Sequence, residues 1–158
     1  MMTGFSADNA SMLRGSISTD RVQFGLGQPI WVTLELHNES AVNMYVFVPT
    51  GRAQGFRFEI RGGQPGTDYE LTGLESEPEP GLVGETRIEP GGSFQQLYPL
   101  TQWVTFKRPG TYVAECEIDI EVHMQSLREQ SPGLPSSTTT IASKVPLTIV
   151  SSVEAGGR

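Results

Sequence analysis

Between Tyr112 and Met124 the chain alternates almost perfectly between small or apolar and polar side chains. One parity is apolar or small throughout, whereas the other carries carboxylates and then a histidine: Glu115, Glu117, Asp119, Glu121 and His123. Only an extended strand repeats every two residues, so the pattern predicts a β-strand with one face in a core and the other in water. The run is long for a single strand, which indicates a bend or one arm of a hairpin.

Shorter runs of the same kind recur along the chain, separated by Gly, Pro, Asn and Ser. They predict strands at residues 13–18, 22–26, 30–37, 42–48, 56–60, 86–88, 94–100 and 138–150. The run at 42–48 is apolar on both faces, which is typical of a central strand. Pro146 lies inside the last run, so that strand is expected to be an edge strand or to contain a break. Many short strands, frequent turn signals and no convincing helix predict an all-β antiparallel β-sandwich of seven to nine strands with Greek-key connections.

The segments between the predicted strands differ in character. Residues 64–85 contain few apolar side chains and several Pro and Glu residues, so we expect a long, mobile excursion there. Residues 101–109 are expected to cross over to the next strand, and residues 125–137 to form a polar loop. Small and polar residues predict flexible tails at 1–11 and 151–158, on either side of a single domain at 12–150.

Composition narrows the possible partners and compartments. The chain has 158 residues and a formal net charge of −7, and it lacks the clustered Lys and Arg that nucleic acid binding needs. No apolar run reaches the roughly 20 residues of a membrane helix, which argues against membrane insertion. The N-terminus has no signal-peptide pattern, so the protein is either cytoplasmic or exported with its signal removed, and we favour the second. The single cysteine, Cys116, falls on the apolar face of its strand, which predicts a buried, unreactive thiol.

Several short motifs occur in the order in which an immunoglobulin-like sandwich uses them. The stretch 24–30 (FGLGQPI) leads into a strand that ends at the turn Asn38–Ser40, and a Pro-Gly-Gly-Ser turn follows at 90–93. A crossover containing Trp103 then leads to Pro-Gly-Thr-Tyr, in which Tyr112 resembles a tyrosine corner. Over about residues 12–150 the chain therefore resembles a bacterial immunoglobulin-like domain, and it is similar to domains of the intracellular proteinase inhibitor type. The resemblance implies an immunoglobulin-like β-sandwich, here without the cysteine pair of antibody domains.

No arrangement typical of catalysis is visible in the sequence. A nucleophile needs a neighbouring base and a group that orients the base, whereas His37 and His123 both fall at solvent-facing strand positions. The carboxylate row at 115–121 is flat, whereas a calcium site gathers about six or more oxygens, usually from a loop. We therefore interpret the row as a solvated face or as a cross-strand partner of Lys144. These observations predict no enzymatic activity, no metal site and no cofactor.

Recognition is predicted on loops and on one aromatic side chain. Trp31 alternates with Ile30 and Val32, so it points away from the core face and either packs under an insertion or is exposed for stacking. Rigid sandwiches place recognition on their loops, here 49–55, 74–85 and 125–137. The candidate partner-binding residues are Trp31, Arg52, Gln54, Leu127, Arg128 and Leu134.

Together these features favour a non-enzymatic β-sandwich module for protein–protein interaction or structural spacing, with a protein as the partner. One alternative, which the resemblance implies, is a proteinase inhibitor that acts through the loop at 125–137. Another is a carbohydrate-binding module that stacks sugars on Trp31. The partner's identity and the oligomeric state stay open at this level.

Overall fold

The computed structural model describes residues 12–52, 55–73, 84–125 and 136–151. These ranges contain strands, one short 3-10 turn, η2 (Leu100–Gln102), and no α-helix. The strands are β1 (Leu13–Ser18), β2 (Gln23–Gly25), β3 (Trp31–Asn38), β4 (Met44–Phe47), β5 (Phe56–Arg61), β6 (Tyr69–Leu71), β7 (Glu85–Ile88), β8 (Ser93–Pro99), β9 (Val104–Phe106), β10 (Gly110–His123) and β11 (Ser137–Val150). All nine predicted strands are present, and two unpredicted strands of three residues each, β6 and β9, bring the number in the described ranges to eleven, above the predicted seven to nine.

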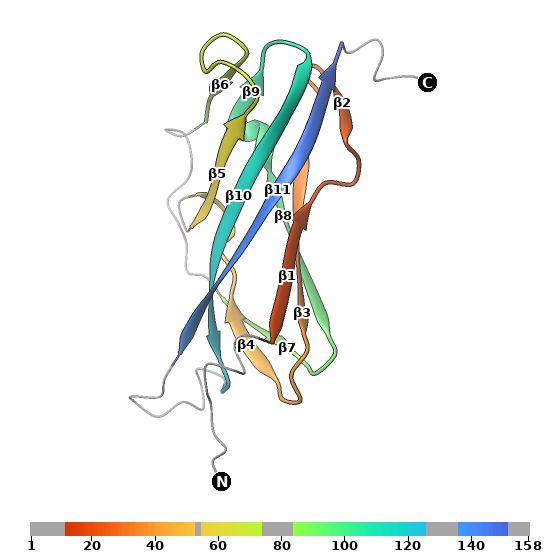
Figure 1. Ribbon diagram of the computed structural model, residues 1–158. Helices are drawn as coiled ribbons and strands as arrows, with labels where there is room; N and C mark the ends of the chain where they lie inside the picture. Colours follow the sequence, from red (N-terminus) through yellow and green to blue (C-terminus); the bar gives the residue numbers. More distant parts are fainter. Residues whose placement is uncertain (1–11, 53–54, 74–83, 126–135, 152–158) are drawn as a thin grey trace.

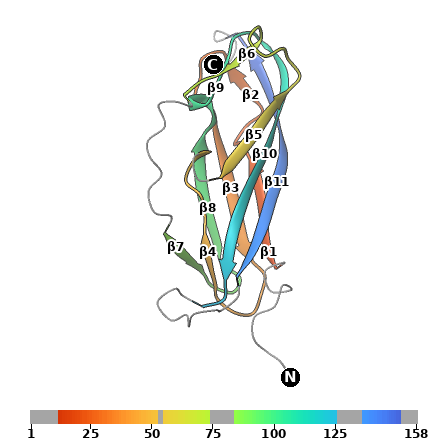
Figure 2. The ribbon, with the colours of Figure 1, turned by 90° about the vertical axis from the view of Figure 1, so that its left-hand side faces the viewer.

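The strands form two main sheets. One has the order β1-β3-β8, and the other has six strands in the order β2-β11-β10-β4-β7, with β5 also paired to β10. In Figure 1 the long β10–β11 hairpin lies in front of β3 and β8, and Figure 2 shows the same layers from the side. All pairs are antiparallel except β2 with β11. This is the predicted all-β, immunoglobulin-like β-sandwich.

The alternating run at 112–124 forms most of β10. Strand β10 pairs with β11 from Gly110 opposite Ile149 to Val122 opposite Ser137, so it is one arm of a long hairpin, as expected. Its inward residues Ala114, Cys116 and Ile118 are almost completely buried. On its other side, β10 pairs with two successive strands, β5 at residues 113–118 and β4 at residues 121–123.

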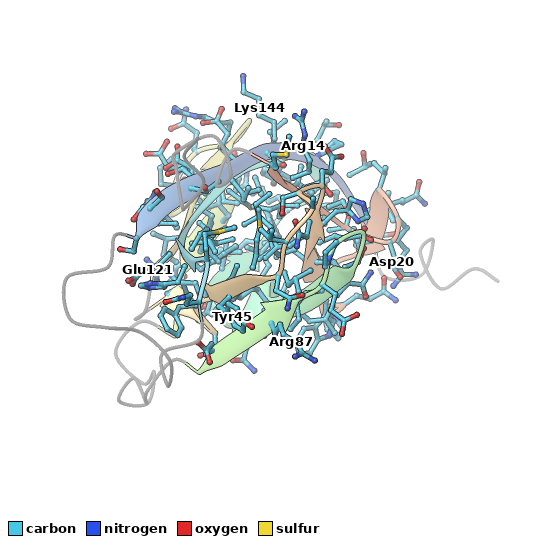
Figure 3. The ribbon with its side chains drawn as sticks, turned by 90° about the horizontal axis from the view of Figure 1, so that it is seen from below. Arg14, Asp20, Tyr45, Arg87, Glu121 and Lys144 are labelled. Atoms are coloured by element: carbon cyan, nitrogen blue, oxygen red, sulfur yellow. The ribbon has the colours of Figure 1, made fainter. Side chains whose placement is uncertain are left out.

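The core lies between the two main sheets. Its largest fully buried side chains come from both of them and include Leu34, Leu36, Phe56, Tyr98, Ile118 and Leu147. Seen from below in Figure 3, Arg14, Asp20 and Lys144 point outward, around this apolar interior. In the described ranges there is no helix with the length and apolar character that a bilayer crossing requires.

Two turns are held by specific side-chain hydrogen bonds. The Tyr112 hydroxyl donates to the Arg108 carbonyl oxygen at 2.8 Å, which is the tyrosine corner that the motif predicts. At the end of β3, the buried Asn38 Nδ2 donates to the carbonyl oxygens of Val42 and Ile88, at 2.8 Å each. Asn38 Oδ1 accepts hydrogen bonds from the Ser40 main-chain N–H and the Ser40 hydroxyl. This side chain therefore joins β3 to the turn and to β7 in the opposite sheet.

Strand β11 contains Pro146 without a break. Pro146 lies opposite Val113 in an uninterrupted strand, so the predicted break is wrong. Strand β2 pairs only with residues 148–150, and no described strand pairs with that edge of β11 at Pro146. Proline lacks an N–H, so it is tolerated where no neighbouring strand needs that donor, which agrees with the predicted edge position.

The expected excursion at 64–85 is partly wrong. Residues 69–71 form β6, which pairs with β9 in a small third sheet, and Tyr69 is buried. The expected crossover at 101–109 supplies η2 and β9. Residues 74–83 and the predicted tails at 1–11 and 152–158 lie outside the described residues.

Candidate interaction surface

The outer face of the β1-β3-β8 sheet carries an apolar patch at one end. Trp31 on β3 is directly opposite Pro99 on β8, and Leu97 lies two residues along, opposite Thr33. The exposed fractions of Trp31 and Leu97 are 49% and 52%, so exposure, and not packing under an insertion, is the observed state of Trp31. Side chains at opposite and diagonal positions of an antiparallel pair are close enough to share one surface. We call Trp31, Leu97 and Pro99 the Trp31 patch.

The other end of this face is polar. Glu35 lies between Ser16 on β1 and Gln95 on β8, and all three side chains are exposed. His37 Nδ1 is 3.0 Å from the Ser93 hydroxyl oxygen. The face therefore combines an apolar end with a hydrogen-bonding end.

The other predicted partner-binding residues are not part of this patch. Arg52 packs on the protein itself, with its guanidinium carbon 5.3 Å from the centre of the Phe58 ring. Gln54, Leu127, Arg128 and Leu134 lie outside the described residues, so the loop at 125–137 stays a prediction. Leu97 was not among the predicted partner-binding residues. Its outward direction could have been predicted, because it alternates with Phe94 and Tyr98 on the predicted strand at 94–100.

Two arginines of β5 form ion pairs with three members of the carboxylate row on β10. Arg57 contacts Glu117 at 2.8 Å and Asp119 at 3.0 Å, and Arg61 contacts Glu115 at 3.3 Å. Lys144 lies directly opposite Glu115 in the β10–β11 register, as predicted for a cross-strand partner, whereas the ion pairs described here come from β5. The reason is the pairing of β5 with β10, which places the arginines on the same outer face.

The pKa shifts follow from these contacts. The hydrogen bond from Arg57, supported by one from the Thr140 hydroxyl, lowers the pKa of Asp119, and the same carboxylate raises the pKa of Arg57. All of these groups are well exposed, so each ion pair contributes little to stability. The described residues contain no group of three or more side chains placed to hold a metal ion.

His123 is buried, which corrects the prediction of a solvent-facing side chain. Its exposed fraction is 6%, its Nε2 is 2.7 Å from Glu121 Oε2, and its ring contacts Phe47 edge-on at 5.2 Å between centroids. The alternation fails at the end of β10 because Phe47, on the neighbouring strand β4, packs against the ring.

Cys116 is buried as predicted, and burial raises the pKa of its thiol from 9.0 to about 12. Because the thiolate is the reactive form, its population falls about 1000-fold. We expect an aromatic disulfide reagent to modify Cys116 at least about 1000-fold more slowly in the folded protein than in urea. The release of the coloured thiol, followed with time, measures both rates, and similar rates would contradict the inward orientation of Cys116.

A concave region lies on the other side of the molecule, between β5 and β6. It has a volume of about 390 Å³ and is lined by residues 58–61 of β5, by Pro65 and Gly66, and by residues 69–71 of β6. Leu71 is 50% exposed beside it. We call this region the β5–β6 groove. It was missed because β6 was not predicted as a strand.

The two main sheets, the tyrosine corner and the split of the first strands between the sheets define an immunoglobulin-like β-sandwich. No protein-family model matches the sequence, and no curated protein matches it. Among solved structures, the chain is similar to the ASH/PapD-like domain (PapD-like domain 7) of human CEP192. The identity is 13%, the match covers 86% of this chain and 84% of that chain, and the TM-score is 0.28. The fold assignment rests on the strand pairing described above.

Proposed function

We propose that this domain is a non-enzymatic module that binds a protein partner through the Trp31 patch. The observation that carries the proposal is the pair of half-exposed large apolar side chains, Trp31 and Leu97, on a rigid sheet face. Tryptophan is enriched at the energetic centres of interfaces, and burial of apolar area contributes about 25 cal/mol per Å². The polar end of the same face, with Glu35 and Gln95, has the composition of an interface rim.

The exposure of Trp31 also supports a second candidate, a carbohydrate-binding module. A sugar would stack on the indole and would need polar groups around it. The cross-strand side chains beside Trp31 are those of Pro99 and Leu97, which offer no hydrogen bonds, and Thr33, two residues along β3, supplies a single hydroxyl. This surrounding favours a protein partner.

The test compares capture by the whole chain with capture by a Trp31→Ser, Leu97→Ser double variant. We expect a protein that is recovered from an extract of the source cells by the native chain to be recovered at least about tenfold less by the double variant. The captured protein is then purified and titrated against both baits. Val22→Ser is the matched control, because Val22 is also exposed (51%) but lies outside the patch.

Equal binding of the purified partner to the native chain and to the double variant would contradict the proposal. Quenching of Trp31 fluorescence by a glycan, lost in Trp31→Ala, would favour the carbohydrate alternative. The inhibitor alternative has its own test: inhibition of subtilisin-like or papain-like enzymes that is lost on deletion of residues 127–135.

A further inference from the structure

We infer that the free edge of β5 binds an extended peptide segment of a partner protein, which adds a strand to the six-stranded sheet and fills the β5–β6 groove. This site is separate from the Trp31 patch and does not depend on it. Strand β5 pairs with β10 on one side, at residues 56–61, and no described strand pairs with its other edge. Further along β10, the equivalent edge of β4 is covered by β7.

Two hydrogen bonds show which main-chain groups of β5 point away from β10. The Phe56 N–H donates to the Gly51 carbonyl oxygen at 3.2 Å, and the Ile60 carbonyl oxygen accepts from the Tyr69 hydroxyl at 3.2 Å. Alternate residues of an antiparallel strand direct their main-chain groups to the same side. The N–H and carbonyl of Phe58, midway between them, therefore also face the free edge. Within the described ranges, neither of these Phe58 groups has a hydrogen-bond partner.

The groove beside this edge has an apolar floor and a fixed wall. Phe58 and Ile60 supply the floor from β5, and Tyr69 and Leu71 face them from β6. Strand β6 is held by its pairing with β9, by the Lys107 N–H bond to the Asp68 carbonyl oxygen at 2.7 Å, and by the ion pair of Lys107 with Glu70 at 2.8 Å. Because β6 is already held in place, less conformational entropy of the protein is lost when a peptide binds beside it.

The charged side chains of β5 do not block the addition of a strand at its free edge. Charged side chains often protect sheet edges from strand addition. Here Arg57 and Arg61 point to the outer face, where the β10 carboxylates bind them. Glu59 and Arg61 also line the groove but are paired with each other at 2.8 Å, and Phe58 and Ile60 supply its apolar side chains from β5.

The geometry selects an extended peptide as the occupant. Only an extended backbone offers a carbonyl and an N–H at the two-residue repeat that the β5 edge presents, with every second side chain directed into the groove. A net charge of −7 opposes the approach of a second copy of this chain and favours a neutral or basic segment. We therefore expect apolar side chains at alternate positions of the peptide and uncharged or basic ones between them.

The experiment uses the whole chain and amide hydrogen exchange read residue by residue by NMR. In the free protein we expect the Phe58 amide to exchange at least about tenfold faster than those of Arg57 and Glu59, which face β10. The probe is a library of acetylated peptides about as long as β5, with Val, Leu, Ile, Phe or Tyr at alternate positions and Lys, Thr or Ser between them. A binding peptide is expected to slow Phe58 exchange at least about tenfold.

Two matched controls separate strand addition from non-specific adhesion. In the first control, the peptide amides that face the β5 edge are N-methylated. This peptide keeps its side chains but loses the hydrogen-bond donors, so we expect it not to slow the exchange of the Phe58 amide. Leu71→Lys places a charge at the groove and is expected to weaken binding at least about tenfold, because Leu71 is half exposed and its replacement spares the core. Val22→Lys, at a similarly exposed site outside the groove, should leave binding unchanged.

Three results would overturn the inference. A Phe58 amide that is already protected in the free protein, independently of concentration, would show that the edge is covered within the chain. Protection that rises with protein concentration would show that a second copy occupies it. Failure of the whole library to slow Phe58 exchange would exclude an extended peptide. None of these results bears on the Trp31 patch, so the two proposals fail separately.

Discussion

Replacing Asn38 with alanine is expected to lower the free energy of unfolding by about 3–5 kcal/mol. The side chain has an exposed fraction of 0% and takes part in four hydrogen bonds, donating to Val42 and Ile88 and accepting twice from Ser40. Alanine removes all four and leaves main-chain groups buried without these partners. Each unsatisfied buried group costs about 1–3 kcal/mol, so the losses accumulate at one turn.

Equilibrium unfolding in urea measures this effect directly. The control is Glu39→Ala at the next residue, where an ion pair with Arg14 is largely exposed and contributes less than about 1 kcal/mol. If Asn38→Ala were no more destabilising than Glu39→Ala, the proposed role of Asn38 in joining β3 to the opposite sheet would be wrong.

Replacing Phe56 with alanine is the second large change, with an expected loss of about 3–5 kcal/mol. The ring is 1% exposed and stacks on Tyr98 at 4.4 Å between centroids, with Trp103 at 5.5 Å. It therefore fills the space between β5 and β8, and its removal leaves a cavity that well-packed neighbours cannot close. Urea unfolding gives the loss in stability. The emission of Trp103, which is buried whereas Trp31 is exposed, reports whether water enters the cavity.

The control for this prediction lies two residues along the same strand. Phe58 faces the same side but is only half buried and is farther from Trp103, at 6.3 Å. Phe58→Ala is expected to lower the free energy of unfolding by less than half as much as Phe56→Ala, because the Phe58 ring buries less apolar area. Equal losses would mean that the interior between β5 and β8 is not packed as described.

The strands that could be predicted from sequence are those whose burial is decided locally. The two-residue alternation of β10 follows from its own side chains, and the parity of Trp31 against Val32 already directs the indole away from the core. The hydroxyl bond of Tyr112 could also be expected, because the donor and the Arg108 carbonyl are close in sequence. In each case the residues that set the structure are neighbours along the chain.

The features that were missed depend on pairing between distant segments. Strand β6 has only three residues in a polar stretch, and it becomes a strand because β9 pairs with it. The burial of His123 depends on Phe47 of β4, and the partners of the carboxylate row come from β5. To predict the β5–β6 groove one must know that β5 lies at the edge of its sheet and that β6 lies beside it. Side-chain periodicity carries neither.

The placement of β1 and β11 has a mechanical consequence. Strand β1 begins at the lower end of the molecule in Figure 1, and β11 finishes at the upper end, where residues 148–150 pair in parallel with β2. Tension applied between Leu13 and Val150 would therefore run along the strands and load the hydrogen bonds of the β2–β11 pair in shear. Bonds loaded in shear must break together instead of one after another, so we expect the β2–β11 pair to resist such a pull more strongly than it would resist being peeled apart.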